Sequence, residues 1–125
     1  MADSKRFLDW YDKSKKDLEG AKILFKHGGD NSIVAFHCQQ SIEKLLKGYI
    51  LKVTQTLSEG HSLVYLCKQA ISFDNSLKPY LKDCAYVNQF YIETRYPADL
   101  PISLTTEETE ECISIAEKLQ GIINK

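Results

Sequence analysis

Long apolar stretches are missing from this sequence of 125 residues. No window holds the roughly 20 predominantly apolar residues that a helix needs to cross a bilayer. The opening residues 1–6 are followed by Phe-Leu-Asp-Trp at 7–10, which lacks the apolar centre of a secretory signal. We therefore expect a cytoplasmic protein with no membrane partner.

An excess of positive charge is missing as well. The formal net charge is −1, so the molecule as a whole lacks the cationic surface that releases counterions from nucleic acid. Any RNA or DNA site must then be a local patch. Hydrophobic residues make up 43% and charged residues 26% of the chain, near the averages of globular domains. Since this length supports one core, we expect a single domain over residues 1–125.

Closely spaced cysteines, which are typical of structural zinc sites, do not occur. The nearest two of the four cysteines are 17 positions apart, whereas zinc ligands usually come in pairs about two to four residues apart. Each cysteine falls instead on the apolar side of a helical pattern: Cys38, Cys67, Cys84 and Cys112. We expect four reduced core residues, and neither a metal nor a cofactor.

What the sequence does contain is helical periodicity along almost its whole length. Apolar residues recur at three- and four-residue spacings, and no segment shows a sustained two-residue period of a strand. The pattern predicts five helices, four long and one short, over about residues 3–27, 33–53, 63–70, 77–94 and 105–123. Joined in antiparallel order, they make an all-α, up-and-down bundle of four to five helices.

Residues with capping preferences stand between these helices. Gly28 suits the left-handed position after a helix end, and Asp30 or Asn31 suits the start of the next helix. Thr105, with Glu108 three residues later, predicts a capping box.

The other boundaries follow from a serine and from prolines. Ser62 can cap the short third helix, and Pro79 is tolerated in the fourth because it falls in the first turn. Residues 95–104 contain two further prolines and no helical period, which predicts a loop.

The helix predicted over residues 33–53 has two different faces. One face carries an apolar stripe that we expect in the core: Val34, Cys38, Ile42, Leu45, Tyr49 and Val53, widened by Ala35 and Leu46. The other face carries a polar row flanked by Ile33 and Leu51; its members are His37, Gln40, Lys44 and Lys47. A plain solvated face does not need those flanking aliphatics. We infer that this second face meets a partner, a ligand or a second copy of the chain, a homodimer being the simplest.

The polar row has a ligand-binding interpretation and a structural one. In the first, the row lines a nucleotide or RNA cleft, with Lys44 and Lys47 on phosphate and Gln40 on a base edge. In the second, Glu43 pairs with Lys47 one turn later, worth about 0.3–0.5 kcal/mol, and the rest lies in a dimer contact. The structural interpretation is favoured for His37, and a desolvated Lys44 needs a carboxylate or phosphate partner.

Three more candidate binding residues lie near helix ends. Arg95 can hold a phosphate through two hydrogen bonds while the ring of Tyr96 stacks on a base. Alternatively, Arg95 caps the fourth helix and Tyr96 closes the end of the bundle. The imidazole of His61 can act as a general acid or base, or it can tie its loop to neighbouring carbonyls.

Several of these residues also carry a resemblance. The run at residues 36–48, Phe-His-Cys-Gln-Gln-Ser-Ile-Glu-Lys-Leu-Leu-Lys-Gly, resembles the signature helix of the HEPN domain family. Further matches occur in the same order along the chain: Trp10, Asp17-Leu18 with Ala21, His61-Ser62-Leu63 and Thr94-Arg95-Tyr96-Pro97. The resemblance implies an antiparallel helical bundle, usually dimeric. It also implies a minimal nucleotidyltransferase as partner, encoded beside the HEPN chain as a toxin–antitoxin pair or fused to it.

The sequence departs from the family where catalysis is concerned. Members that cleave RNA resemble one another in an Arg followed after four to six residues by a His, and neither Arg6 nor Arg95 has a His at that spacing. The resemblance and this departure together favour a nucleotide- or RNA-binding interaction module over an enzyme. Two alternatives are a metal-independent ribonuclease toxin that uses His37, His61 and Arg95, and a purely structural dimeric partner.

Overall fold

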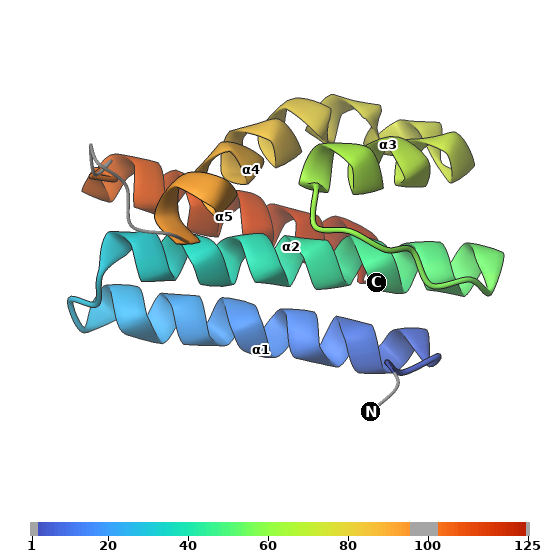
Figure 1. Cartoon of the computed structure of the whole chain (residues 1–125), viewed down its shortest axis with the longest axis horizontal. Coiled ribbons are helices and arrows are strands. Elements are labelled where there is room, and N and C mark those ends of the chain that lie inside the picture. The colour runs from blue at the N-terminus through green and yellow to red at the C-terminus, as the bar shows by residue number, and fades with distance from the viewer. Residues whose placement is uncertain (1–2, 96–102, 125) are drawn as a thin grey trace.

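Five α-helices and one short 3₁₀ helix make up residues 3–95 and 103–124, which this computed structural model describes. In chain order they are α1 (Phe7–Lys26), α2 (Asn31–Thr54), α3 (Leu63–Phe73), η1 (Asn75–Tyr80), α4 (Leu81–Arg95) and α5 (Thr106–Ile123). No strand occurs in these residues. α1 and α2 run antiparallel side by side, and the remaining helices pack on the other side of α2 (Figure 1). The predicted all-α bundle is confirmed.

The helix ends form where the capping residues predict them. Gly28 follows α1 with a φ of 76°, in the left-handed region. The side chain of Asp30 accepts hydrogen bonds from two backbone N–H groups in the first turn of α2, and the side chain of Ser62 accepts one from the backbone N–H of Tyr65 in α3. Thr105 and Glu108 form the complete capping box of α5. Local sequence therefore determines these boundaries.

The fourth helix begins later than the sequence pattern predicts. Residues Asn75–Tyr80, which include Pro79, form a 3₁₀ helix, and α4 starts only at Leu81. The proline ring supplies no N–H for an α-helical hydrogen bond, and a short 3₁₀ turn often precedes an α-helix. Leu77 is nevertheless buried, so this turn still contributes to the core.

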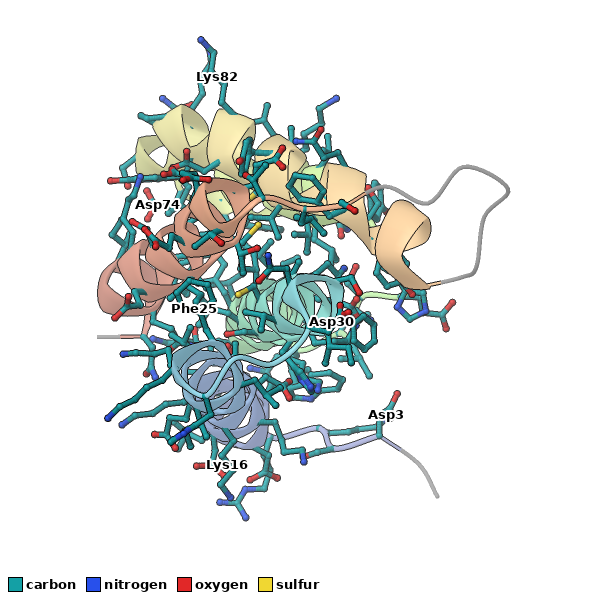
Figure 2. The ribbon with its side chains drawn as sticks, turned by 90° about the vertical axis from the view of Figure 1, so that its left-hand side faces the viewer. Asp3, Lys16, Phe25, Asp30, Asp74 and Lys82 are labelled. Carbon is teal, nitrogen blue, oxygen red and sulfur yellow. The ribbon has the colours of Figure 1, made fainter. Side chains whose placement is uncertain are left out.

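α2 is the central helix, since each of the other four described α-helices packs against it (Figure 2). Most of its predicted apolar stripe is fully buried: Val34, Ala35, Cys38, Ile42, Leu45 and Leu46. The stripe ends early, however, because Val53 in the last turn of α2 is 41% exposed. Leu51, predicted to flank the second face, is buried beside Phe7 and Leu8 at the start of α1. The second face is therefore partly covered within one chain.

Two serines bring α1 and α2 close together. Ser14 Oγ donates to the backbone carbonyl of Ser41 at 2.5 Å, and Ser41 Oγ donates to the backbone carbonyl of Ser14 at 2.8 Å. Both residues are buried. Small hydroxyl side chains that bond to the facing backbone let the two helices pack tightly without leaving unsatisfied polar groups.

All four cysteines are buried and free, as predicted. Across residues 3–95 and 103–124, no group of three or more His, Cys, Asp or Glu side chains is arranged to hold a metal ion. No helix in the same ranges combines the length and the apolar character that a bilayer crossing needs.

Candidate functional site

The segment between α2 and α3 carries the chain back along α2. Gln55 ends α2 in the left-handed region, with a φ of 65°. Residues 55–62 then run alongside the second half of α2 before α3 begins (Figure 1). Because an α-helix rises only about 1.5 Å per residue and an extended segment about 3.3 Å, this short segment returns His61 to the level of Glu43. Glu43, in the middle of α2, thus gains His61 of this segment as a partner.

Glu43 lies at the centre of a hydrogen-bonded group that we call the Glu43 cluster; its other members are Gln39, Lys47 and His61. Gln39 Nε2 donates to Glu43 Oε1 at 3.2 Å, and Lys47 Nζ donates to Glu43 Oε2 at 3.1 Å. Nδ1 of His61 lies 3.2 Å from each carboxylate oxygen. Gln39 Nε2 also donates to the backbone carbonyl of His61 at 2.9 Å, which ties the loop to α2.

The members of the Glu43 cluster differ in exposure. The side chains of Glu43 and Lys47 are 6% and 9% exposed, whereas that of His61 is 58% exposed. A buried carboxylate is costly unless a cation and hydrogen-bond donors accompany it, and Lys47 supplies the cation. Since Nδ1 of His61 faces the carboxylate, Nε2 is left for a group outside the protein. A carboxylate behind an imidazole fixes the orientation of the ring for binding or acid–base chemistry.

A row of rings continues from His61 across α4 and back to α2. The rings of His61 and Tyr91 lie 5.8 Å apart, and Tyr91 stacks on Phe36 with centroids 6.2 Å apart and an interplanar angle of 15°. Phe36 meets the ring of His37 edge-on at 6.0 Å. His37 and His61 therefore lie at the two ends of one aromatic row. Such a surface can stack a nucleic acid base.

Lys44 lies apart from the Glu43 cluster. Its Nζ donates to Oδ2 of Asp17 on α1 at 2.5 Å, and the two side chains are mostly buried. Lys44 thus has the carboxylate partner that its position requires. A hollow of about 220 Å³ lies beside it, lined by Ser4, Asp9, Trp10, Lys13 and Lys44. Lys47 Nζ lies 6.0 Å from the ring centroid of Trp10, so Lys47 connects this hollow with the Glu43 cluster.

The structure brings some of the predicted residues together and separates others. Lys47 and His61 meet at Glu43. Gln40 joins them indirectly, since its Nε2 donates to Oε1 of Gln39 at 2.9 Å. The polar row of α2 is therefore divided between the α4 side and the α1 side, instead of forming one open surface.

The two predicted residues that follow the fourth helix cannot be placed in the site. α4 ends at Arg95, but the side chain of Arg95 and the whole of Tyr96 lie outside the described residues. The binding roles of both stay predictions.

Three participants were not predicted as site residues: Gln39, Glu43 and Asp17. A signal existed for the first two, because Gln39, Glu43 and Lys47 follow one another at four-residue spacing along α2. That spacing places polar groups on one line of a helix that is otherwise surrounded by other helices. No local signal pairs Asp17 with Lys44, because they lie on different helices, 27 positions apart.

The comparison with family models identifies one known family. A model of the HEPN domain matches residues 7–125. The chain belongs to the HEPN domain family. The HEPN match includes every helix described above and the whole Glu43 cluster. The comparison with curated proteins found no match.

Two solved structures share this HEPN architecture over nearly their full length. One is the crystal structure of TT1696 from Thermus thermophilus, 25% identical, with a TM-score of 0.85 over 97% of this chain and 98% of that chain. The other is ST0689, described as an archaeal HEPN homologue, 24% identical, with a TM-score of 0.76 over 97% of each chain. The second likeness supports the fold alone.

Proposed function

We propose that this HEPN protein is a nucleotide- or RNA-binding interaction module, not primarily an enzyme. It acts in the cytoplasm as a homodimer, paired with a minimal nucleotidyltransferase in the manner of a toxin and its antitoxin. Membership in the HEPN family supports the proposal. The observation that carries it is the half-exposed imidazole of His61, held by the buried carboxylate of Glu43 and flanked by the ring of Tyr91.

The Glu43 cluster suits a ligand that combines phosphate with an aromatic base. His61 can hydrogen-bond through Nε2 to a ligand, because its Nδ1 faces the Glu43 carboxylate. The stacked rings of Tyr91 and Phe36 beside His61 offer aromatic contacts for the base. Gln40, held by Gln39, adds an amide for a base edge. Because His61 is the exposed member of the cluster, it is the residue to test.

Binding can be measured by fluorescence anisotropy with a short labelled single-stranded RNA and, separately, with labelled ATP. We expect His61→Ala to weaken binding by about 10- to 100-fold, since a charge-assisted hydrogen bond is worth about 1.5–3 kcal/mol. His27→Ala is the matched control, because His27 is an exposed histidine at the end of α1. Equal binding by both variants would remove His61 from the site. If neither ligand binds the wild-type protein, the binding proposal is wrong.

Several exposed apolar side chains support the dimer. Large hydrophobic residues on α1, α2 and α3 are more than 40% exposed: Leu8, Ile23, Ile33, Val53, Tyr65 and Phe73. Sedimentation equilibrium tests the dimer directly, and a strictly monomeric protein would contradict it.

The proposed partner is tested by co-expression with a minimal nucleotidyltransferase from the neighbouring reading frame, which should yield a co-purifying complex. Two separately eluting proteins would contradict the pairing.

The same imidazole favours a second candidate function, metal-independent RNA cleavage. A carboxylate at Nδ1 leaves Nε2 of His61 free to take a proton from a 2′-hydroxyl, as a general base does. Incubation of labelled RNA with the protein in EDTA tests it. If RNA is cut and His61→Ala abolishes cutting, the module is an enzyme. Intact RNA, with binding retained, rejects this candidate.

A further inference from the structure

The hollow at the start of α1, which we call the Trp10 hollow, has a binding chemistry of its own. It is formed by Ser4, which precedes α1, by Asp9, Trp10 and Lys13 of α1, and by Lys44 of α2. Its volume of about 220 Å³ is below the range of about 300–1,000 Å³ that holds a whole drug-sized ligand. It can therefore enclose one ring system and leave the rest of a ligand outside.

The indole of Trp10 is held in a fixed orientation. Its Nε1 donates to the backbone carbonyl of Ser4 at 2.9 Å, and Ser4 Oγ donates to Oδ2 of Asp9 at 2.7 Å. These bonds occupy the polar atom of the indole and engage one oxygen of the aspartate. The ammonium of Lys47 lies 6.0 Å from the ring centroid. What the indole offers to the hollow is therefore an apolar, prearranged aromatic surface.

Beside this ring, Lys13 is the cation that an anion can bind. Two lysines, Lys13 and Lys44, line the hollow, against one aspartate. Lys44 is already paired with Asp17. Lys13 is exposed and pairs with no carboxylate within residues 3–95 and 103–124. One uncommitted cation next to an aromatic ring is the combination that single-stranded nucleic acid sites use, with stacking for the base and an ammonium for the phosphate.

We propose that the Trp10 hollow binds a nucleobase that carries a phosphate, with the base stacked on Trp10 and the phosphate held by Lys13. This inference rests on the proposed function, because the ligand belongs to the same class, a nucleotide or RNA. The binding place is different, since the hollow lies on the α1 side of α2, away from His61. Lys47 lies between the two places, since it pairs with Glu43 and its Nζ lies 6.0 Å from the ring centroid of Trp10. A free nucleotide and a single-stranded RNA share the required chemistry.

Trp10 itself reports on binding, because it is the only tryptophan in the chain. We expect a short single-stranded RNA to quench its fluorescence saturably, and ribose 5-phosphate, which has no base, to leave the emission unchanged. A titration with AMP distinguishes a free nucleotide from RNA as the ligand. If AMP quenches the emission at the same concentration as RNA, the hollow is a nucleotide site. If RNA quenches it at a much lower concentration than AMP, the hollow is an RNA site. Either result supports the proposal.

Lysine variants test the phosphate contact. Lys13→Ala should weaken RNA binding severalfold and lower the slope of log affinity against log salt by about 1. The matched control is Lys16→Ala, an exposed lysine on the same helix that pairs with Asp12 and does not line the hollow. If anisotropy shows RNA binding while Trp10 emission stays constant and both lysine variants bind alike, this inference is wrong and the proposed function stands. If RNA and nucleotides fail to bind at all, both are wrong.

Discussion

At the scale of single residues, the most unusual feature is an ion pair inside the bundle. Glu43 and Lys47 are one helical turn apart, and both side chains are less than 10% exposed. On a helix surface such a pair contributes only a few tenths of a kcal/mol. Here each charge is withdrawn from water, so each depends on the other and on the hydrogen bonds from Gln39 and His61.

Removing one partner of this pair should be much more costly than removing both. We expect Lys47→Met to destabilise the protein by about 3–5 kcal/mol, because it leaves the Glu43 carboxylate buried without a cation. Adding Glu43→Gln to that variant should recover part of the loss. Lys16→Met is the control, since the exposed pair of Lys16 with Asp12 contributes at most about 1 kcal/mol. Urea unfolding measures all variants, and equal effects for Lys47→Met and Lys16→Met would contradict the prediction.

A second residue-scale prediction concerns Gly48, which faces α1. A Cβ atom there would lie 2.8 Å from the ring of Tyr11 and 3.0 Å from Cβ of Trp10. Tyr11 cannot easily move, because it is buried, and that burial raises the pKa of its hydroxyl to about 12. Gly48→Ala should therefore cost about 1–3 kcal/mol through overpacking.

Gly20→Ala provides the matched comparison for Gly48. Gly20 also lies inside a helix, but nothing stands within 4 Å of an added Cβ. The substitution should stabilise α1 by about 0.5–1 kcal/mol, since alanine loses less backbone entropy on folding. Thermal unfolding should move the melting temperature in opposite directions for the two variants, and a shift in the same direction would refute the packing argument.

At the scale of elements, α2 depends on how its first turn is capped. The hydroxyl and the backbone N–H of Ser32 hydrogen-bond to the Asp30 carboxylate and lower its pKa. A carboxylate whose pKa is lowered in the folded state stabilises the folded protein. This stabilisation is fully present above the unfolded-state pKa of about 3.9, and it is lost as the pH falls through the folded-state pKa.

The pH dependence of the cap can be isolated with Asp30→Asn, which keeps the capping oxygen but does not titrate. The advantage of the wild type over Asp30→Asn should be constant from neutral pH down to about pH 5 and then shrink below about pH 4. Urea midpoints at a series of pH values measure it. A difference between the two proteins that stays constant down to about pH 2 would show that the carboxylate charge contributes nothing.

At the scale of the whole molecule, packing around α2 protects all four thiols. Burial raises the pKa of Cys112 to about 12 and raises the pKa of Cys38 further. The neighbouring thiol of Cys84 lowers the pKa of Cys67, but Cys67 is only 2% exposed. We expect no thiol to react with Ellman's reagent in the native state at about pH 8, and all four to react in denaturant. Rapid reaction of one thiol in the native protein would reveal local opening.

The helices and their caps could be predicted because they depend on neighbours in sequence. The apolar stripe of α2 follows from a three- to four-residue period in the sequence. The turn after α1 follows from a glycine, Gly28, that can adopt a left-handed backbone. The exposure of Val53 could not be predicted, since periodicity does not show where a long helix extends past its neighbours. The late start of α4 reflects a choice between α and 3₁₀ geometry around Pro79 that composition alone does not decide.

The site was harder to predict, since its contacts join distant parts of the chain. His61 meets Glu43 only because residues 55–62 turn back along α2, a path that no motif encodes. The partner of Lys44 depends on the rotation of α1, which places Asp17 opposite it. The sequence therefore identified several participants, and the fold decided which of them meet.

The central position of α2 also has a consequence for how the chain folds. α1 and α2 are joined by a turn of only four residues, 27–30, so their many contacts close small loops, whereas α5 must return from far along the sequence. Contacts between nearby segments lose less chain entropy and form sooner. We expect the α1–α2 hairpin, in which Ser14 and Ser41 hydrogen-bond to each other's backbone carbonyls, to be the folding nucleus. Substitutions there should slow folding, whereas those in α3 should mainly speed unfolding.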